Sequence, residues 1–582
     1  MTKKQGAGIN FRAFNSDVAV GVAAMLLGAV CFIAVYGVCV LDPTYDDWLL
    51  GRGDLTQHYL GWRFFCESEW TFPIGLTNRL AYPDDSSVIF TDSIPLFAVF
   101  FKLLSPILPD TFQYFGWWGL VCFMLQGLFA AKILTALDVK GSRALAGSIL
   151  FILSPVVIEK MFRHTALGGH WIILAAIYLF VRHRELYGNV RKTSLYFGLI
   201  GAYVGSVHLY LLPMCGAFVC GFVLSSLLCS LFCSMLCARR GEKPGRAPVF
   251  GIRGKLCMLK YVLPGISYAV CLLACTWLLG GFSTRAEAGS SDLGQFSFNL
   301  NGFFNAKGYS RFLSPLNTYY DGQYEGFAYL GLGVLCLFVP SLVYMIRSLY
   351  GKHAGKCKKS DGTGVIYGVV YALMCAGLIV LAASPEVTFG DRLLFVLTDS
   401  STLTHYWSIF RSTGRMVWPV CYLIYIGVIV CSDRLFRGRR AATALLVLCA
   451  AVQIFDISGK LKSQRNTFAE KKTYESPLQS EVWQQAAEND ALEHVVWVSH
   501  NIDNNGILHI AKFALDNGLT MNNYYFARGI NVNENTKKSL EHPSEDCLYI
   551  FRSDETEGID GYGLNLYEAD GYILGTVEAL GN

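Results

Sequence analysis

Three polar residues that could do chemistry stand close together near the start of the chain: Asp54, Gln57 and His58. Asp after Gly is typical of a helix start, and the spacing i, i+3, i+4 places the three side chains on one helix face. A carboxylate there could accept a proton from a reacting hydroxyl, beside an imidazole and an amide. The alternative is that Asp54 only caps the helix. The other face is an apolar stripe suited to lying on a bilayer surface: Leu55, Tyr59, Trp62 and Cys66.

A second group of ionisable residues fills a short turn between two apolar stretches. It contains Glu159, Arg163, His164 and His170, and ionisable groups at such a depth are expensive and usually functional. Glu159 could be a second carboxylate, and the histidines could bind an anion or a hydroxyl. The alternative is that Lys160 and Arg163 snorkel and a histidine packs in the core. The spacing of the two histidines fits no simple metal site on one helix face, so the sequence assigns no metal ligands.

Two arginines form a third group, in the segment Phe410-Arg411-Ser412-Thr413-Gly414-Arg415. Arg411 and Arg415 are spaced i, i+4 and would face one ligand if the segment is helical. Arginine pairs suit bidentate phosphate binding. The alternatives are contact with lipid headgroups or an ion pair with Asp391 or Asp399.

The loop at 283–325 is rich in Phe, Tyr, Asn and Gly and ends beside Glu325, at the mouth of an apolar stretch. Aromatic and amide side chains suit the apolar face and hydroxyl edges of a sugar ring. They equally suit the aromatic belt of any membrane protein. Glu325 is the residue of this loop that we select as a candidate for substrate binding.

The elements that must position these groups are membrane-spanning helices, because 53% of the 582 residues are hydrophobic and only 16% are charged. A span needs about 20 apolar residues. The sequence predicts eleven: 17–41, 112–136, 143–159, 168–182, 194–212, 214–237, 261–282, 326–346, 363–383, 414–431 and 441–457. Ser93–Leu108 is short and contains two prolines, which favours a re-entrant or interfacial segment. The net charge of +4 gives no reason to expect a nucleic-acid partner.

The distribution of Lys and Arg predicts the orientation in the cell membrane. Basic clusters fall in the loops at 182–193, 238–260, 347–360 and 432–440, which become cytoplasmic with eleven spans and residues 1–16 inside. The 42–92 loop, which carries the predicted active-site helix, is then extracytoplasmic. The basic residues between Lys460 and Lys472 disagree, although long domains translocate largely regardless of charge.

The tail differs in kind from the transmembrane region at 17–457. After a polar linker at 458–475, residues 476–582 alternate helix and strand patterns, which predicts a small extracytoplasmic α/β domain. We expect helices at 476–487 and 507–517 and strands at 495–498, 548–551, 564–567 and 572–577. The domain has no Gly-rich phosphate loop, so the sequence assigns it no chemistry.

The arrangement resembles the C superfamily of glycosyltransferases, polytopic enzymes that take sugars from polyprenyl-phosphate donors. The resemblance is carried by Asp54-Leu55-Thr56-Gln57-His58-Tyr59 in the first outer loop, by the cluster at 159–170 and by the segment ending in Arg415, and it is closest to a bacterial branch. It implies an inverting transfer in which Asp54 is the base and Arg411 and Arg415 bind the leaving phosphate. In the family the first acid is often followed by Glu or paired with a DxD-type motif, whereas Leu55 follows Asp54 here. The partner acid and any divalent metal therefore stay open.

The resemblance implies a lipid-linked sugar donor and a glycan, lipid or protein acceptor at the cell envelope. One rival reading is a transporter or flippase of a lipid-linked or anionic substrate. Transporters more often show inverted repeats and polar residues near mid-span, whereas the ionisable residues here gather at one face. Another is a polysaccharide polymerase or ligase, which would share the donor and the topology.

Overall fold

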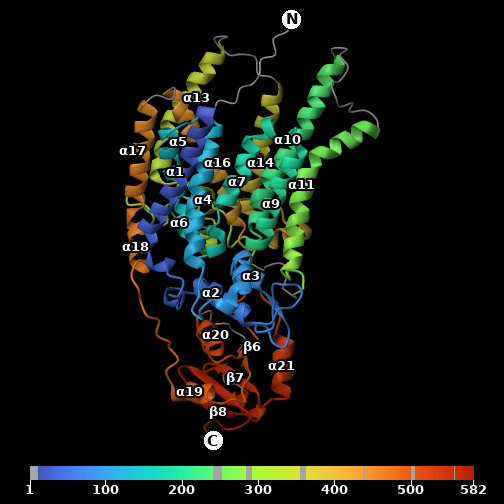
Figure 1. Ribbon diagram of the computed structural model, residues 1–582, viewed down its shortest axis with the longest axis vertical. Coiled ribbons are helices and arrows are strands. Elements are labelled where there is room, and N and C mark those ends of the chain that lie inside the picture. Colours follow the sequence, from blue (N-terminus) through green and yellow to red (C-terminus); the bar gives the residue numbers. More distant parts are fainter. Residues whose placement is uncertain are drawn as a thin grey trace.

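The computed structural model describes residues 11–239, 252–283, 292–353, 362–436, 440–499, 505–555 and 558–581. Parts of the predicted N-terminal segment, of the 283–325 loop and of three basic loops lie outside these ranges. A bundle of long helices forms the body of the molecule, and a small domain containing a sheet lies at one end (Figure 1). The prediction of a polytopic helical membrane protein with a C-terminal α/β domain is confirmed.

Within the described ranges, eight helical segments are long and apolar enough to cross a membrane. They are α1 (Phe11–Tyr36), α4 (Phe115–Ala136), α5 with α6 (Ser142–Ile152, Pro155–Lys160), α10 (Leu211–Arg239), α11 (Ile252–Leu278), α12 with α13 (Leu332–Cys336, Phe338–His353), α14 (Gly362–Ala383) and the 3-10 helix η8 with α16 (Thr413–Val417, Trp418–Leu435). A further pair, α17 (Arg440–Asp456) and α18 (Ser458–Phe468), is bent by 59°. The linker predicted at 458–475 therefore begins as a helix.

Two of the eleven predicted spans are helical but do not meet the length and composition of a span. The helix α7 (Trp171–Val181) has 11 residues, and α9 (Val190–Val207) contains many small and polar ones. The composition of α9 follows from its packing against α11. A Cβ on Gly201 would lie 2.2 Å from the carbonyl oxygen of Tyr268, so the two backbones can approach only through glycine. The count of eleven spans stays a prediction.

The segment between α1 and α3 folds into short elements around one longer helix. These are η1 (Cys39–Leu41), η2 (Asp47–Leu49), α2 (Asp54–Glu67), a hairpin of β1 (Leu76–Thr77) and β2 (Ser86–Ser87), and η3 (Val88–Thr91). The predicted helix start at Asp54 is confirmed. The prediction that α2 lies on the bilayer surface is wrong, because Leu55, Tyr59 and Trp62 are buried. The helix is enclosed between the bundle and the C-terminal domain (Figure 1).

Shorter elements connect the spans. The segment predicted to be re-entrant or interfacial contains α3 (Pro95–Leu104) and η4 (Ser105–Ile107). The turn at 161–170 contains η5 (Thr165–Gly168), and α8 (His183–Leu186) follows α7. The described part of the 283–325 loop holds η6 (Leu300–Phe303) and η7 (Asp321–Tyr324). Between α14 and η8 the chain forms an antiparallel hairpin, β3 (Glu386–Phe389) with β4 (Arg392–Val396), and then α15 (Ser401–Ser408).

The C-terminal domain is built on a mixed sheet in the order β6-β5-β7-β9-β8. Its elements are α19 (Glu481–Ala487), β5 (His494–Trp497), α20 (Gly506–Asp516), β6 (Thr520–Met521), α21 (Asn533–Glu541), β7 (Cys547–Arg552), η9 (Ile559–Tyr562), β8 (Asn565–Ala569) and β9 (Tyr572–Thr576). The strand β5 runs parallel to both neighbours, while β7, β9 and β8 are antiparallel. The predicted helices and strands are present, and β6 and α21 are additional.

Candidate active site

Four segments far apart in the sequence meet where the bundle faces the C-terminal domain. Asp54 is the first residue of α2, His164 lies in the turn after α6, Glu325 follows η7, and Arg415 lies in η8. Each of these residues stands at a helix end or in a turn, where the chain changes direction at the mouth of the bundle. Short connections can therefore bring their side chains to one point.

An imidazole joins two carboxylates at this point. Nδ1 of His164 lies 3.1 Å from an oxygen of Asp54, and Nε2 lies 3.0 Å from an oxygen of Glu325. The other oxygen of Glu325 accepts hydrogen bonds from Nζ of Lys160 at 2.6 Å and from Nε of Arg415 at 2.9 Å. Lys160 is fully buried and the Glu325 side chain is 5% exposed, whereas the Asp54 side chain is 26% exposed. Asp54 is thus the open end of a buried charged network.

Burial and the nearby Lys160 lower the pKa of His164 below its ordinary value. The ring is then neutral near pH 7 and can donate its single proton to one carboxylate at a time. Burial would raise the pKa of Glu325, but the cations Arg415 and Lys160 outweigh it and hold that pKa well below its usual range. Glu325 is therefore ionised, and together with its two cations it leaves a net positive charge beside His164.

Glu159 and Arg163 form a neighbouring pair. Arg163 and the Tyr309 hydroxyl both donate hydrogen bonds to Glu159, and Lys460 lies 4.0 Å away. The Arg163 guanidinium also stacks 4.9 Å from the centre of the Tyr324 ring. Glu159 is thus already paired in the structure. Arg163 lies at the edge of the site and is not part of the Glu325 network.

Gln57, His58 and His170 are buried and do not join the network. Nδ1 of His58 lies 3.2 Å from the Thr165 hydroxyl, and Nδ1 of His170 lies 2.6 Å from the Tyr422 hydroxyl. Although Gln57 and His58 share a helix face with Asp54, they lie deeper along α2, where the C-terminal domain covers the helix. These side chains form a packed layer behind Asp54.

Arg411 and Arg415 do not lie on one helix, which was the condition for their side chains to face one ligand. The helix begins at Thr413, after Arg411, so the two residues lie on different elements. Arg415 is buried in the network, whereas the Arg411 side chain is 56% exposed and its Nε lies 3.2 Å from Asp292. The guanidinium of Arg411 also stacks 4.5 Å from the centre of the Phe296 ring. Its acidic partner is thus neither Asp391 nor Asp399.

Asp92 is a further carboxylate of the same region. Its carboxylate lies 3.5 Å from Nε2 of His208, and its backbone is left-handed, with φ of 54°. Burial would raise the pKa of Asp92, but His208, His58 and His164 together lower it to about 2. Asp92 therefore adds a second ionised carboxylate behind Asp54. His208, some 116 positions away in the sequence, could not be linked to it from spacing.

An aromatic residue of the C-terminal domain contacts Asp54. The Tyr524 hydroxyl donates to the carbonyl of Gln57 at 2.6 Å, and the backbone N–H of Ala527 donates to the carbonyl of Phe90 at 2.7 Å. Between these contacts Tyr525 hydrogen-bonds Asp54, and burial followed by the charge of Asp54 raises the pKa of Tyr525 to about 12. The run Tyr524-Tyr525-Phe526 is the only sequence signal for this contact.

The charged groups do not suit a divalent metal. Two cations already neutralise Glu325, and a metal ion there would be repelled by Lys160 and Arg415. Across the described ranges, no group of three or more His, Cys, Asp or Glu residues is arranged to hold a metal ion.

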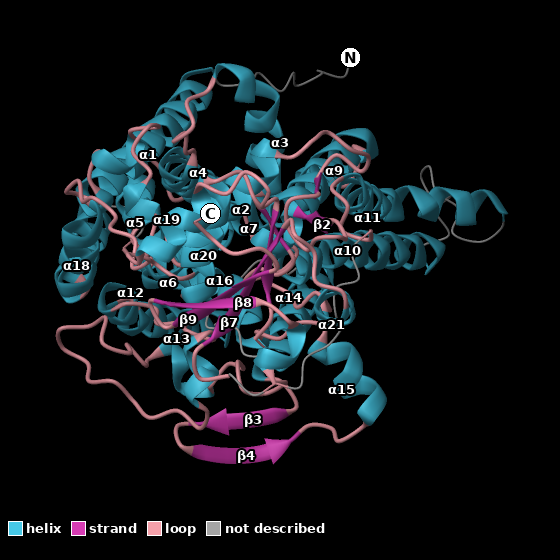
Figure 2. Cartoon of the chain, turned by 90° about the horizontal axis from the view of Figure 1, so that it is seen from below, coloured by secondary structure: helices cyan, strands magenta, loops and turns pink. Residues whose placement is uncertain are grey.

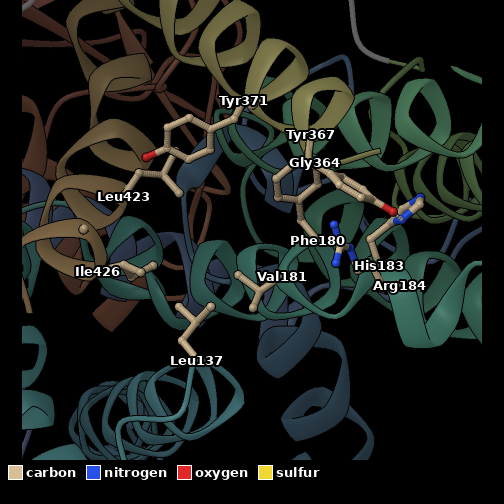
Figure 3. Close-up of a pocket in the computed structure, with 12 residues that line it drawn as sticks. Leu137, Phe180, Val181, His183, Arg184, Gly364, Tyr367, Tyr371, Leu423 and Ile426 are labelled. Carbon is tan, nitrogen blue, oxygen red and sulfur yellow. Dashed lines mark hydrogen bonds between the residues drawn. The ribbon is translucent and has the colours of Figure 1, made fainter. Parts of the chain in front are cut away.

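A cavity of about 460 Å³ lies at the opposite end of the bundle, between the end of α7 and the start of α14 (Figure 3). Tyr367 stands at its polar edge, where its hydroxyl lies 2.8 Å from Nδ1 of His183 and the Arg184 guanidinium stacks over its ring. None of the residues that line this cavity is a predicted site residue.

The chain is similar to solved structures at low sequence identity. Among solved structures, an oligosaccharyltransferase of Archaeoglobus fulgidus tethered with an acceptor peptide is similar at 11% identity over 91% of this chain and 69% of that one, with a TM-score of 0.43. ArnT from Cupriavidus metallidurans bound to undecaprenyl phosphate is similar at 10% identity over 97% and 98% of the two chains, with a TM-score of 0.35. No curated protein matches. Residues 482–577 match the DUF6311 C-terminal domain. Residues 25–458 match the domain of unknown function DUF6311, and the chain therefore belongs to the DUF6311 family.

Proposed function

We propose that this protein is a membrane glycosyltransferase, which moves a sugar from a polyprenyl-phosphate donor to a hydroxyl of a glycan, lipid or protein acceptor. The observation that carries the proposal is the contrast within one network, where partly open Asp54 is joined through His164 to buried Glu325 with its two cations. A base at the mouth and fixed positive charge behind it are what attack by a hydroxyl and departure of a phosphate require. The side of the membrane we assign is the extracytoplasmic one, from the Lys and Arg distribution.

In the proposed reaction the acceptor oxygen forms a bond to C1 of the sugar on the face opposite the leaving group. The hydroxyl proton passes to Asp54, the bond from C1 to the phosphate oxygen breaks, and the electron pair leaves with the polyprenyl phosphate. The configuration at C1 is inverted. Neutral His164 orients the Asp54 carboxylate through Nδ1, while the net positive charge around Glu325 stabilises the phosphate.

In this reaction the two arginines do not bind the phosphate as a pair. Arg415, with Lys160 behind it, supplies the buried positive charge, and exposed Arg411 stands at the outer rim. The aromatic residues near the rim, Tyr324, Tyr525 and Phe296, offer flat surfaces to a sugar ring.

Asp54→Asn tests the proposal. The N-cap position belongs to Gly53, so an amide at position 54 should leave α2 and the stability of the protein nearly unchanged. Because an amide cannot take a proton, we expect the transfer rate to fall by a factor on the order of 10²–10⁴. The measurement is mass analysis of surface glycans in cells that lack the gene, carry it, or carry the variant, with thermal unfolding of each purified protein.

Asp84→Asn is the matched control, because Asp84 lies in the same loop and contacts Asn535 of the C-terminal domain at the surface. It should retain full transfer. If Asp54→Asn produced the same glycans as the unaltered protein, Asp54 would not be the base. If deleting the gene left every surface glycan unchanged, the transferase assignment itself would fail.

A further inference from the structure

The segment between α14 and η8, residues 384–412, has an unusual distribution of apolar side chains. We call it the arm; it comprises the β3–β4 hairpin and α15. All five residues of β4 are exposed. The strand has a bulge at Leu394, because Val387 pairs with Phe395 whereas the next residue, Thr388, pairs with Leu393. Paired residues share a face and neighbours in β3 alternate, so Leu393 and Val396 lie on one face and Phe395 lies on the other. An antiparallel hairpin in water normally has one polar face. Both faces of this one are apolar.

The apolar surface extends beyond β4. Eight large apolar or aromatic side chains of the arm are each at least 40% exposed: Phe389, Leu393, Leu394, Phe395, Val396, Leu397, Leu403 and Tyr406. Large exposed apolar surface of this kind marks a contact with a protein or a membrane. Its position in the fold distinguishes the two.

The arm extends sideways from the rim of the bundle. In the view along the long axis, β3, β4 and α15 lie outside the ring of helices (Figure 2). The arm continues from the end of α14, whose Leu373, Val380 and Leu381 are exposed as lipid-facing residues are. The indole N–H of Trp407 donates to the carbonyl of Leu381 at 3.1 Å, which ties α15 to the last turn of that span.

The base of the arm is fixed by polar contacts. Gln323 donates to the Thr388 hydroxyl at 2.8 Å, and Asn299 makes two hydrogen bonds with the backbone of Gly390, at 2.8 and 2.9 Å. Gln323 precedes Glu325 by two residues. The arm is therefore held in its sideways direction by the loop that brings Glu325 to the site.

We propose that the arm inserts into the headgroup and acyl-chain boundary of the bilayer leaflet on the side of the C-terminal domain. A protein partner would cover one face of the hairpin, whereas lipid covers both. The aromatic residues Tyr406 and Trp407 suit that boundary, where such rings collect. Contact with lipid at this depth, about 5–10 Å below the membrane surface, is independent of the reaction that the protein catalyses.

An environment-sensitive fluorescent amino acid in place of Phe395, and separately of Val396, tests the proposal in phosphatidylcholine nanodiscs. Both should emit at blue-shifted wavelengths and lose most of their emission when the lipids carry bromine near the headgroup end of their chains. The same residue in place of Leu373 in α14 should be quenched by lipids brominated deeper in their chains. In place of Leu566, an exposed apolar residue of β8 in the C-terminal domain, it should stay unquenched.

Two results would overturn the proposal. Emission at both arm positions like that of the Leu566 position would place the arm in water. A blue shift at Phe395 without quenching, together with a doubled mass of the protein in native mass spectrometry, would show that a second copy covers the arm. Each substitution lies at an exposed position and removes no hydrogen bond, so the protein should still fold.

Discussion

The two ends of the His164 network are built differently although each is a carboxylate facing the same imidazole. At the Glu325 end every oxygen is paired with a buried cation or with the ring, and solvent is excluded. At the Asp54 end the carboxylate begins a helix, is partly open, and meets a tyrosine from another domain. The buried end fixes charge in place, and the open end can accept a new hydrogen-bond donor. Substitutions at the two ends should therefore affect different measurements.

Glu325→Gln should have the largest effect on stability. It leaves Lys160 and Arg415 buried without their countercharge, which costs about 3–5 kcal/mol of the free energy of unfolding. Asp54→Asn, at the open end, should cost less than about 1 kcal/mol. Denaturant unfolding of the purified proteins in the same detergent measures both. Equal losses at the two ends would remove the distinction between them.

The two arginines sharpen the contrast between buried and exposed charge. Arg415→Gln should cost about 3 kcal/mol, because Lys160 still neutralises part of Glu325. Arg411→Gln, whose side chain pairs with Asp292 at the surface, should change stability by no more than about 1 kcal/mol. The same unfolding experiment compares them. A loss at Arg411 as large as that at Arg415 would contradict the assignment of Arg411 to the rim.

Acidification should weaken the fold through His164. Its pKa is lowered in the folded protein, so the unfolded chain binds a proton first as the pH falls, and stability is lost below the unfolded value of about 6.5. At pH 5 this contributes at most about 2 kcal/mol. The difference in melting temperature between pH 7 and pH 5 should shrink in His164→Gln. It should be unchanged in the control His542→Gln, which alters an exposed histidine of the C-terminal domain.

Tyr525→Phe should have only a small effect on the rate of transfer. It keeps the ring and removes one hydrogen bond to Asp54, worth about 1 kcal/mol, or roughly a five-fold change in transfer rate. Tyr562→Phe in η9, far along the chain from the site, is the matched control. Initial rates of sugar transfer in membranes check the pair. A loss as large as that of Asp54→Asn would instead make the phenol part of the reaction.

Local patterns in the sequence predicted local structure well. The start of α2 at Asp54 followed from Gly53 and helical spacing, and the strands of the C-terminal domain followed from their apolar runs. The β3–β4 hairpin could not be recognised from the sequence, because an apolar run next to a span has the composition of the membrane domain. The strand β6 has only two residues, too few to show a period.

Partners across the chain could not be predicted. Spacing located Asp54, His164, Glu325 and Arg415 as separate candidates, but nothing in it joined them. Lys160 appeared as a snorkelling residue because its burial depends on Glu325, which is 165 positions away. A single sequence does not show such pairings, because the partners lie at the ends of different helices and meet only in the folded protein.

The contact between β6 and the loop at 42–92 has a consequence for how the protein can be divided. The backbone N–H of Met521 donates to the carbonyl of Arg79, and the N–H of Tyr82 donates to the carbonyl of Met521, both at 2.9 Å. The membrane region thus closes the open edge of the sheet, where unpaired backbone groups would otherwise recruit other chains. A fragment containing only residues 476–582 would expose that edge. We expect this fragment to aggregate. The regions 25–458 and 482–577 should therefore have to be expressed together as one chain.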